Sequence, residues 1–582
     1  MRETVVIPTY WGRRSTEGWK KGDAIYDHPT PVDKEGTLKR TLESLKDLND
    51  KDFKLVILLC PTTIDIEKEA EEKVRNIINS VDMGIETFLF TPNSLRNIKS
   101  IFKSSNMKRE IIDMISLKGY SNVRNMCLFS AHILASDVII LIDDDEIIEN
   151  KDFISMSKKY IGKRIYGEII YGVAGYYLNK HDEYYDDVDM EPWMTYWDRF
   201  GSKAKAFDKI IGCEPRLKQT PFAFGGAMVI HKNLYQLIAF DPNITRGEDI
   251  DYLINSKMFG FNFFLDNKLS VKHLPPKKNH PVWQRFREDI YRFMYERAKI
   301  SSQYQVNNMT IVKPEDFDPY PGEFLKDDLE DKIYKTNVLL SLEYLAEGDM
   351  EASKETMKNI YISKYEAVKE KDPFTQYRHI QKNWQKIIEF TMKNRYQIRK
   401  IMESDNLSKQ NVNTKQKQRD MSLKDKISKI KGIKEFSIFT EEEIEEIAQI
   451  SNIKFFNDNE MVFKEGEQDS KFYIILDGCI NIFKYSDKNK NEELSLATLC
   501  TGNFIGETAI ATEKYYVSGK ATEFLTVLSI EQSQIEEIVR SKPSMGMKFL
   551  QIFVDKLSYK LGKTNKLYAD YLLQTSHLED MN

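Results

Sequence analysis

Cysteine is scarce in this sequence, with five among 582 residues and no CxxC pair. Such widely spaced cysteines predict neither a structural zinc site nor a disulfide framework, and they favour a reducing cytoplasm. Long apolar stretches are also missing, because no window approaches the ~20 apolar residues that a membrane-spanning helix needs. The apolar run at the N-terminus is too short for a signal peptide. We therefore expect a cytoplasmic protein that is at most peripheral to a membrane.

The sequence also lacks an excess of positive charge. Lys and Arg number 85 against 90 for Asp and Glu, a net charge of −5, which argues against a globally basic nucleic-acid-binding protein. Hydrophobic residues make up 41% and aromatic residues 12%, too much for a mainly disordered chain. Because one core stops growing beyond ~250–300 residues, we expect several domains.

Residues 1–285 show short apolar runs that alternate with helical patterns. The candidate strands are Val5–Ile7, Leu55–Leu59, Thr87–Phe90 and Val138–Ile142. Such alternation is typical of βαβ units, in which the strands are buried on both faces. It predicts an α/β domain with a mostly parallel sheet.

The rest of the chain divides into three regions. Residues 286–405 carry apolar residues at helical spacing and predict a helical region. Residues 406–434 are polar and basic, which is typical of a linker. Residues 435–582 combine short strand patterns with turn signals and predict a small antiparallel β-roll with flanking helices.

Three aspartates, Asp143, Asp144 and Asp145, follow the apolar run 138–142 directly. In open α/β sheets, ligands bind beyond the carboxyl ends of the strands. Clustered carboxylates repel one another unless a cation lies between them, and Mg²⁺ and Mn²⁺ prefer oxygen ligands. Taken alone, the cluster is equally consistent with a solvated acidic turn.

Further polar and glycine-rich signals occur in the same region. An Arg heading a helix can pair with a diphosphate, a Gly-Gly pair permits close backbone approach, and a strand-end imidazole can bind a metal. The residues concerned are Pro8, Thr9 and Tyr10 after the first strand, Arg124, Gly225 with Gly226, Glu248 with Asp249, and His273.

In this order and spacing, residues 3–280 resemble the nucleotide-sugar-dependent glycosyltransferases of the GT-A fold, in particular the family-two-like group. The resemblance implies a Rossmann-like GT-A domain. It also implies a hexosyltransferase-like enzyme that moves a sugar from a nucleotide-sugar donor to an acceptor that the sequence does not identify.

The resemblance also implies roles for individual residues. Glu248 and Asp249 would be the catalytic acidic pair, one of them a base that deprotonates the acceptor hydroxyl. Gly225 and Gly226 would line the acceptor side. The donor nucleotide would be bound by Pro8, Thr9, Tyr10, Arg124, Asp143 and Asp144, and a Mn²⁺ or Mg²⁺ ion by Asp143, Asp145 and His273.

Each of these residues also has an ordinary structural interpretation. His273 is consistent with a plain strand-end histidine, and an acidic pair suits any helix N-terminus for dipole reasons. Many relatives carry an acidic residue after the second strand, where this sequence has Cys60–Thr63. The identity of the donor nucleotide is therefore not predicted. A late His also occurs in retaining members, so the choice between inversion and retention stays open too.

Residues 436–575 resemble the cyclic nucleotide-binding domain of catabolite-activator and kinase-regulatory proteins. The resemblance lies in Asp477-Gly478 and in the run that begins at Gly502. It places Gly506, Glu507, Thr508 and Ala509 in the phosphate-binding pocket. The Arg that should pair with the phosphate is missing, because no Arg occurs between Thr508 and Val539. A cyclic nucleotide and a different small effector therefore both stay open as ligands.

The apolar stripe of the last predicted helix needs a partner, either within the chain or in a homodimer. It is made of Phe549, Ile552, Phe553, Leu557 and Leu561. A DNA-binding helix-turn-helix after this helix is not expected, so we expect no DNA partner.

The leading interpretation is a metal-dependent glycosyltransferase with a regulatory or oligomerising C-terminal domain. Two alternatives stay open: a non-catalytic signalling or scaffold protein with a degenerate GT-A domain, and a nucleotidyltransferase.

Overall fold

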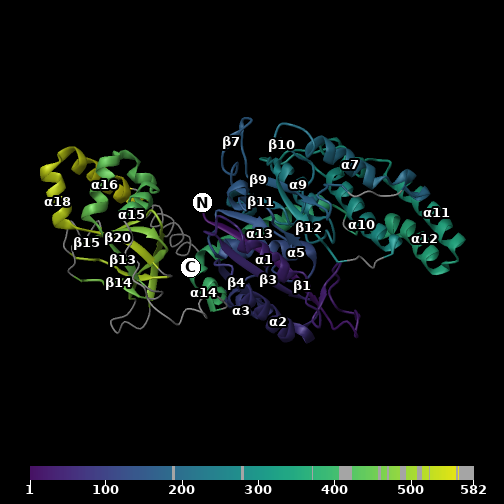
Figure 1. Ribbon diagram of the computed structural model, residues 1–582, viewed down its shortest axis with the longest axis horizontal. Coiled ribbons are helices and arrows are strands. Elements are labelled where there is room, and N and C mark those ends of the chain that lie inside the picture. Colours follow the sequence, from purple (N-terminus) through teal and green to yellow (C-terminus); the bar gives the residue numbers. More distant parts are fainter. Residues whose placement is uncertain are drawn as a thin grey trace, which may run out of the picture. The chain divides into compact units, whose positions relative to one another are not determined.

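The computed structural model describes residues 1–185, 190–276, 281–369, 371–404, 423–456, 460–467, 471–485, 493–506, 514–522, 525–558 and 561–562. The chain divides into two compact units, Met1–Thr414 and Lys415–Asn582 (Figure 1). Each unit has its own sheets and its own hydrophobic cores.

Ten of the described strands form one sheet in the first unit, and eight of them follow the order β10-β12-β9-β11-β5-β1-β3-β4. Their bounds are β1 (Glu3–Gly12), β3 (Lys54–Pro61), β4 (Glu86–Phe90), β5 (Val138–Leu141), β9 (Gly172–Leu178), β10 (Leu217–Gln219), β11 (Met228–His231) and β12 (Phe263–His273). The strands β1, β3, β4 and β5 run parallel, but β11 is antiparallel to both of its neighbours. The sheet is therefore mixed, with five parallel and four antiparallel strand pairings, so the prediction of a mostly parallel sheet is confirmed only in part. The apolar pattern of a buried strand does not reveal its direction.

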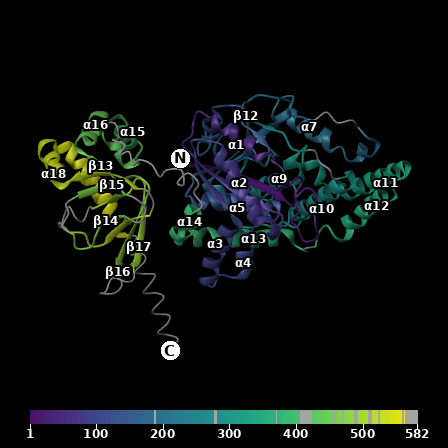
Figure 2. The same ribbon diagram turned by 60° about the horizontal axis from the view of Figure 1, so that its bottom comes forward.

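Alternate residues of the parallel strands face two different hydrophobic cores, as the period of two in a strand requires. Val6 and Val56 pack with α3 and α5, whereas Val5 and Leu55 pack with α1 and α2. Figure 2 shows α3, α4, α13 (Pro373–Lys393) and α14 (Arg395–Ser404) together on one side of the unit. The helices of this part are α1 (Leu38–Lys46), α2 (Glu67–Ser80), α3 (Pro92–Ser104), α4 (Arg109–Asp113), α5 (Tyr120–Ile133), α6 (Phe153–Ser157), α7 (Arg199–Ile210), α8 (Lys232–Tyr235) and α9 (Glu248–Met258).

Short strands complete the first unit. β2 (Thr30–Pro31) extends the sheet beside β1, and β6 (Glu146–Ile147) pairs with β12. A separate pair is formed by β7 (Arg164–Ile165) and β8 (Glu168–Ile169). The pairing of β2 and β6 matters for the site, because it brings the segments around residues 28 and 145 to the ends of β1 and β12.

The region after residue 281 is helical, as its spacing predicts, and it belongs to the first compact unit. Its helices are α10 (Val282–Ser301), α11 (Leu329–Glu347), α12 (Met350–Tyr365), α13 (Pro373–Lys393) and α14 (Arg395–Ser404). The Trp384 indole N–H donates to the Tyr235 carbonyl at 2.8 Å, and the Tyr377 hydroxyl donates to the Ala239 carbonyl at 2.8 Å. These two bonds hold α13 against the segment that follows β11.

A buried ion cluster joins α10 to α9. The Lys299 ammonium lies 2.5 Å from Asp251 Oδ1 and 3.2 Å from Asp241 Oδ2, and all three side chains are fully buried or nearly so. The Tyr295 hydroxyl also donates to Asp241 at 3.0 Å. Because a buried charge is tolerated only with its partners in place, this cluster constrains where α10 lies relative to α9.

The second unit is a β-sandwich with flanking helices. The described strands form two antiparallel sheets of four, β13-β20-β15-β18 and β14-β19-β16-β17. Tyr473 and Ile475 of β15 face the core between the sheets, whereas Phe472 and Ile474 face the helices. The elements are α15 (Leu423–Lys431), α16 (Glu441–Ile450), β13 (Asn452–Phe456), β14 (Met461–Phe463), β15 (Lys471–Asp477), β16 (Cys479–Tyr485), β17 (Glu493–Cys500), β18 (Phe504–Ile505), β19 (Ser518–Ala521), β20 (Leu525–Glu531) and α18 (Gln532–Ser541).

A disulfide joins Cys479 and Cys500, a single pair that the sequence analysis did not predict. The two residues are direct partners in the antiparallel register of β16 and β17, and their Cα atoms are 4.1 Å apart. The 21-residue separation in the sequence conceals this pairing, because it depends on the register of the strands.

The helical residues 543–558 cover part of their apolar stripe within the second unit. Phe549 and Ile552 are buried in the core beside α16, whereas Leu557 and Leu561 are 41% and 62% exposed. Packing within the chain therefore accounts for Phe549, Ile552 and, in part, Phe553, and the homodimer stays a prediction. Among the described residues, no helix has the length and apolar content to cross a membrane.

Replacing Lys299 by Met should lower the free energy of unfolding of the first unit by about 3–5 kcal/mol, because two buried carboxylates then lose their cation. All six tryptophans lie between residues 11 and 384, so tryptophan fluorescence during urea unfolding reports this unit alone. The matched control is Lys354→Met on an exposed face of α12. Equal stability of the two variants would contradict the prediction.

Candidate functional site

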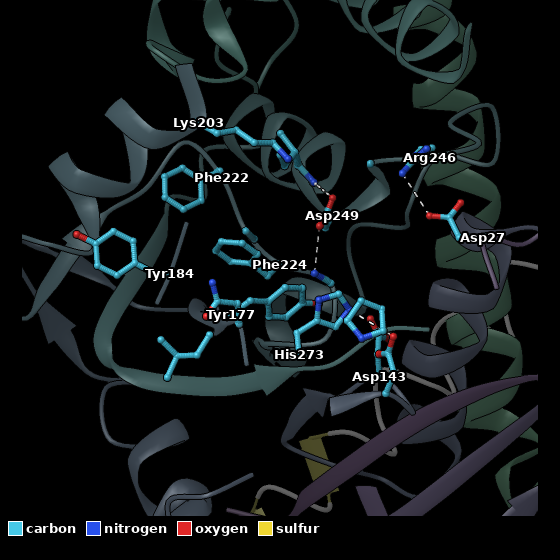
Figure 3. Close-up of a pocket in the computed structure, with 18 of the residues that line it drawn as sticks. Asp27, Asp143, Tyr177, Tyr184, Lys203, Phe222, Phe224, Arg246, Asp249 and His273 are labelled. Atoms are coloured by element: carbon cyan, nitrogen blue, oxygen red, sulfur yellow. Dashed lines mark hydrogen bonds and ion pairs between the residues drawn. The ribbon is translucent and has the colours of Figure 1, made fainter. Parts of the chain in front are cut away.

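A cavity of about 1210 Å³ opens in the first unit beside the ends of β1, β5 and β12 (Figure 3). It is lined by residues that are up to 310 positions apart in the sequence, from Tyr10 to Tyr320. Of the predicted site residues, the lining includes Tyr10, Arg124, Asp143, Asp144, Asp145, Gly225, Glu248, Asp249 and His273. Pro8, Thr9 and Gly226 are not part of the lining, and the last two support residues that are.

Arg124 of α5 binds two acidic segments of the site at once. Its Nη1 and Nη2 lie 2.7 and 2.9 Å from the two carboxylate oxygens of Asp143, and its Nε lies 3.2 Å from Glu248 Oε1. The paired contact with Asp143 uses the fork geometry that only Arg offers. The structure thus places Arg124 against Asp143, and both oxygens of Asp143 have a cationic partner.

Gly225 and Gly226 are close to side chains of the site. A Cβ at position 225 would lie 2.3 Å from Arg124 Nη2, and a Cβ at position 226 would lie 2.0 Å from Glu146 Oε1. The amide of Gly226 donates to the Tyr177 hydroxyl at 2.8 Å. A side chain at either position would therefore displace Arg124 or Glu146.

Asp145 faces two imidazoles. Its Oδ2 lies 3.0 Å from His28 Nε2 and 3.4 Å from His273 Nε2. Burial by itself raises the pKa of this carboxyl, but the hydrogen bonds with the two histidines outweigh burial and hold the pKa of Asp145 well below its usual range. Asp145 is therefore a carboxylate at neutral pH.

Asp144 is buried beside Asp145 and accepts a hydrogen bond from the Thr9 hydroxyl at 2.6 Å. Burial, together with the charge of Asp145, raises the pKa of Asp144 to about 7. The two neighbouring carboxyls therefore differ strongly in acidity because their surroundings differ.

The donor set predicted for a metal is only partly assembled. Among the described residues, no group of three or more His, Cys, Asp and Glu side chains is placed to hold a metal ion. Asp143 contacts Arg124, whereas Asp145 and His273 lie together with His28, a residue that the sequence analysis missed. Carboxylate and imidazole are suitable donors for Mn²⁺, although the present arrangement is a hydrogen-bonded one.

Asp249 lies at the start of α9, with its carboxylate toward the cavity. Its Oδ2 accepts the amide of Gly225 at 3.1 Å, and its Oδ1 accepts the amide of Ile250 at 2.8 Å. Glu248 is the neighbour that pairs with Arg124, and burial, together with the charge of Asp249, raises the pKa of Glu248. Of the two, Asp249 lies in the cavity lining without an Arg partner in the described residues, whereas Arg124 engages Glu248.

Three tyrosines form an aromatic wall of the cavity: Tyr10, Tyr26 and Tyr120. Their ring centroids are 4.4 Å apart for Tyr10 and Tyr26, and 5.3 Å apart for Tyr26 and Tyr120. Tyr26 and Tyr120 were missed from the sequence, where nothing marks them as neighbours of Tyr10. The Tyr10 hydroxyl is buried without a hydrogen-bond partner in the described residues.

In the second unit, Gly506 has a positive φ of +92°, and a Cβ there would lie 2.4 Å from the Lys471 carbonyl oxygen. The predicted pocket residues Glu507, Thr508 and Ala509 lie outside the described residues. Tyr515 stands near the position that the family pattern gives to the phosphate-binding Arg. Its ring stacks on Phe463 at 4.4 Å and its hydroxyl donates to the Lys471 carbonyl at 3.0 Å.

Lys520, which could replace that Arg as a cation, is already paired. Its ammonium lies 2.7 and 2.8 Å from the two carboxylate oxygens of Glu493 on the neighbouring part of the sheet.

Comparison with known proteins identifies the fold of the second unit. Residues 453–542 match the cyclic nucleotide-binding domain family. A candidate HTH-type transcriptional regulator of Porphyra purpurea, ycf28, is 30% identical over 118 residues, which are 19% of this chain and 48% of that protein. This chain therefore spans about half the length of that relative.

Solved structures resemble the same part of the chain. The catabolite activator protein of Thermus thermophilus is 18% identical, with 23% of this chain and 62% of that chain covered and a TM-score of 0.21. The regulatory subunit of a cAMP-independent protein kinase A from Trypanosoma cruzi, bound to guanosine, is 16% identical. The match covers 25% of this chain and 51% of that chain, with a TM-score of 0.21. At such TM-scores these likenesses carry no argument about the ligand. The family match by itself shows that the second unit contains a cyclic nucleotide-binding domain.

Replacing Gly225 by Ala should displace the Arg124 guanidinium and destabilise the first unit by about 1–3 kcal/mol, the usual cost of overpacking. Gly12→Ala is the matched control, because a Cβ there meets Pro29 at an ordinary 3.5 Å. Urea unfolding followed by tryptophan fluorescence measures both. A Gly225→Ala protein as stable as the control would show that Arg124 can move without cost.

Proposed function

We propose that the first unit transfers a sugar from a nucleotide-sugar donor to an acceptor hydroxyl. One observation carries this proposal: a single cavity brings together the acidic strand end with Asp145, the cation Arg124 and the carboxylate of Asp249. A strand-end position suits a bound ligand in an open α/β sheet. The GT-A resemblance of the sequence names the same residues, and the cavity supports that assignment by gathering them.

The donor end of the cavity has the chemistry that a nucleoside diphosphate requires. Arg124 can offer its guanidinium to phosphate oxygens, and the aromatic wall of Tyr10, Tyr26 and Tyr120 offers flat surfaces to a base. A diphosphate there would compete with Asp143 and Glu248 for Arg124, so donor binding and the position of these carboxylates are coupled.

A divalent cation, Mn²⁺ or Mg²⁺, is part of the proposal. Asp145, His28 and His273 would hold the ion through a carboxylate and two imidazoles, which are suitable donors for Mn²⁺. When bound, such an ion supplies Lewis-acid neutralisation of the leaving diphosphate. His28 replaces Asp143 in this set, because both oxygens of Asp143 are paired with Arg124.

Asp249 is the proposed base. The acceptor hydroxyl gives its proton to a carboxylate oxygen of Asp249, its oxygen forms the new glycosidic bond, and the bond from the sugar to the diphosphate breaks. Glu248 is less suited to this step, because Arg124 engages one of its oxygens. A carboxylate base that activates the acceptor directly implies inversion at the sugar carbon.

For the second unit we propose a regulatory role through a small effector. The family match supports a ligand-binding domain, and Tyr515 argues for a ligand other than a common cyclic mononucleotide. The stacking of Tyr515 on Phe463 occupies the place from which an Arg would reach a phosphate.

Incubation of the full chain with a panel of nucleotide sugars and Mn²⁺ should release nucleoside diphosphate. Asp249→Asn should lower turnover about 10²–10⁴-fold, because the general base is lost, while donor affinity stays within twofold. The control is Asp327→Asn, an exposed carboxylate outside the cavity. Excess chelator should also stop the reaction.

The absence of donor binding and donor hydrolysis across the panel would reject the enzyme and favour a non-catalytic scaffold. Full activity in excess chelator would reject the divalent cation and leave the proposed transferase activity in place. A large loss of donor affinity in Asp249→Asn would show that Asp249 binds the donor and is not the base on the acceptor side.

Cyclic AMP and cyclic GMP should not bind the second unit at micromolar concentrations. A buried cyclic phosphate without its guanidinium partner loses about 3–5 kcal/mol, or roughly hundreds- to thousands-fold in affinity. Isothermal titration calorimetry on the full chain measures this directly. A dissociation constant of micromolar or below for either nucleotide would show that other groups replace the Arg.

A further inference from the structure

A second group of charges lines the cavity on the side of α7 and α10. Its cationic members are Arg199 and Lys203 of α7 and Arg285 and Arg292 of α10, all in the cavity lining. In Figure 3 the Lys203 side chain extends toward Asp249, while Asp143 and His273 lie together on the other side of the cavity. We call these four residues the basic wall.

The basic wall has more positive than negative charge. Arg199 pairs with Asp289, and the Nε of Arg292 donates to Glu296 at 2.9 Å. Lys203 has no ion-pair partner within 4.0 Å among the described residues, and its ammonium lies 5.2 Å from the centre of the Tyr320 ring. Four basic side chains thus face three carboxyl groups, those of Asp289, Glu296 and Asp249.

Two of the arginines have hydrogen-bond donors to spare. Arg292 is 5% exposed, and its Nη2 is buried without a partner in the described part of the chain. The Nε of Arg285 is likewise buried and unpartnered there. An unsatisfied donor on a buried charged group is costly, so its presence in a cavity wall indicates a site made for an acceptor.

The pKa of Lys203 reflects its burial together with the excess of positive charge in the basic wall. Burial and the charge of Arg199 lower the pKa of Lys203 from its ordinary value to about 7, and Arg292 acts in the same direction. Asp289 and Asp249 oppose this change, and Tyr320 is the ring beneath the ammonium. An anion placed here would restore the charged form.

The basic wall adjoins the proposed base. Gly247 directly precedes the acidic pair, and a Cβ on it would lie 2.2 Å from Arg292 Nη1. The guanidinium of Arg292 therefore rests against the turn that positions Asp249. Both Arg292 and Lys203 are near enough to Asp249 for its charge to act on them.

We infer that the basic wall is an anion-binding subsite on the acceptor side, so the acceptor carries a phosphate or carboxylate group close to the hydroxyl that Asp249 activates. The assignment to the acceptor rests on the proposed function, whereas the anion-binding site itself rests on the geometry alone. An anionic group could also come from the diphosphate of the donor, which is the same chemistry from a second source. The distribution of charge favours the acceptor, because Arg124 and Asp145 already define a donor end.

Sulfate is the probe, because its charge does not change between pH 6 and 8. Titrated into the full chain at constant ionic strength, it should raise the unfolding temperature of the first unit, followed by tryptophan fluorescence. Lys203→Met and Arg292→Met should each weaken sulfate binding about tenfold or more, the usual effect of a lost hydrogen bond to a charged group. Lys205→Met, an exposed lysine of the same helix, is the matched control and should bind sulfate as the natural protein does.

The affinity for sulfate should also fall between pH 6 and 8, because Lys203 loses its proton there, and Lys203→Met should remove that part of the pH dependence. Glycerol 3-phosphate should stabilise the unit, and glycerol should not. The affinities for UDP and GDP, measured on the same variants, should stay within twofold.

No stabilisation by sulfate, or equal affinity in all three variants, would overturn the inference. An equal loss of UDP or GDP affinity in Lys203→Met would assign the basic wall to the donor diphosphate and overturn the acceptor assignment. If Arg292→Met fails to fold, the sulfate affinity of Lys203→Met and the pH dependence of sulfate binding test the inference without it. Sulfate binding without any donor binding would reject the proposed transferase and leave an anion site, so the two failures are distinguishable.

Discussion

The three-way contact of Arg124 holds the candidate site together. It joins α5, the acidic turn after β5 and the first turn of α9, three segments that meet only in the folded chain. Without this guanidinium, the half-buried Asp143 and the buried Glu248 would have no cation between them, and the buried carboxylate would be left unpaired at a cost of several kcal/mol. The contact also explains Gly225, because a side chain there would occupy the space of Arg124 Nη2.

From this contact the cavity divides by charge. On one side the carboxylate of Asp145 lies between His28 and His273, and on the other the basic wall adjoins Asp249. In the proposed function both sides would receive an anion: the donor diphosphate near Arg124 and the cation held by Asp145, and the anionic group of the acceptor against the basic wall. Specificity in such a cavity comes from its electrostatics as well as from its shape.

The site residues that could be predicted from the sequence are those at the end of a strand or at the start of a helix. The aspartates after the fourth apolar run, the acidic pair and His273 all reach one cavity, because strand ends and helix starts converge at one edge of such a sheet. The sequence analysis missed His28, Lys203 and Arg292, which lie in a loop or on helices whose local pattern records no cavity. It also missed the direction of β11 and the pairing of Cys479 with Cys500, because strand direction and register are settled by contacts far apart in the chain.

Control of the first unit by the second has a thermodynamic requirement that does not depend on how the units are placed. If an effector bound to the cyclic nucleotide-binding domain changes donor affinity by some factor, then bound donor changes effector affinity by the same factor. A ligand with equal affinity for both states of the chain shifts nothing, however tightly it binds. Regulation therefore depends on an effector contact that differs between the two states. Gly506 is held against the Lys471 carbonyl, and the Tyr515 hydroxyl donates to that same carbonyl. A ligand that displaces Tyr515 would therefore remove a hydrogen bond from the carbonyl that lies against Gly506.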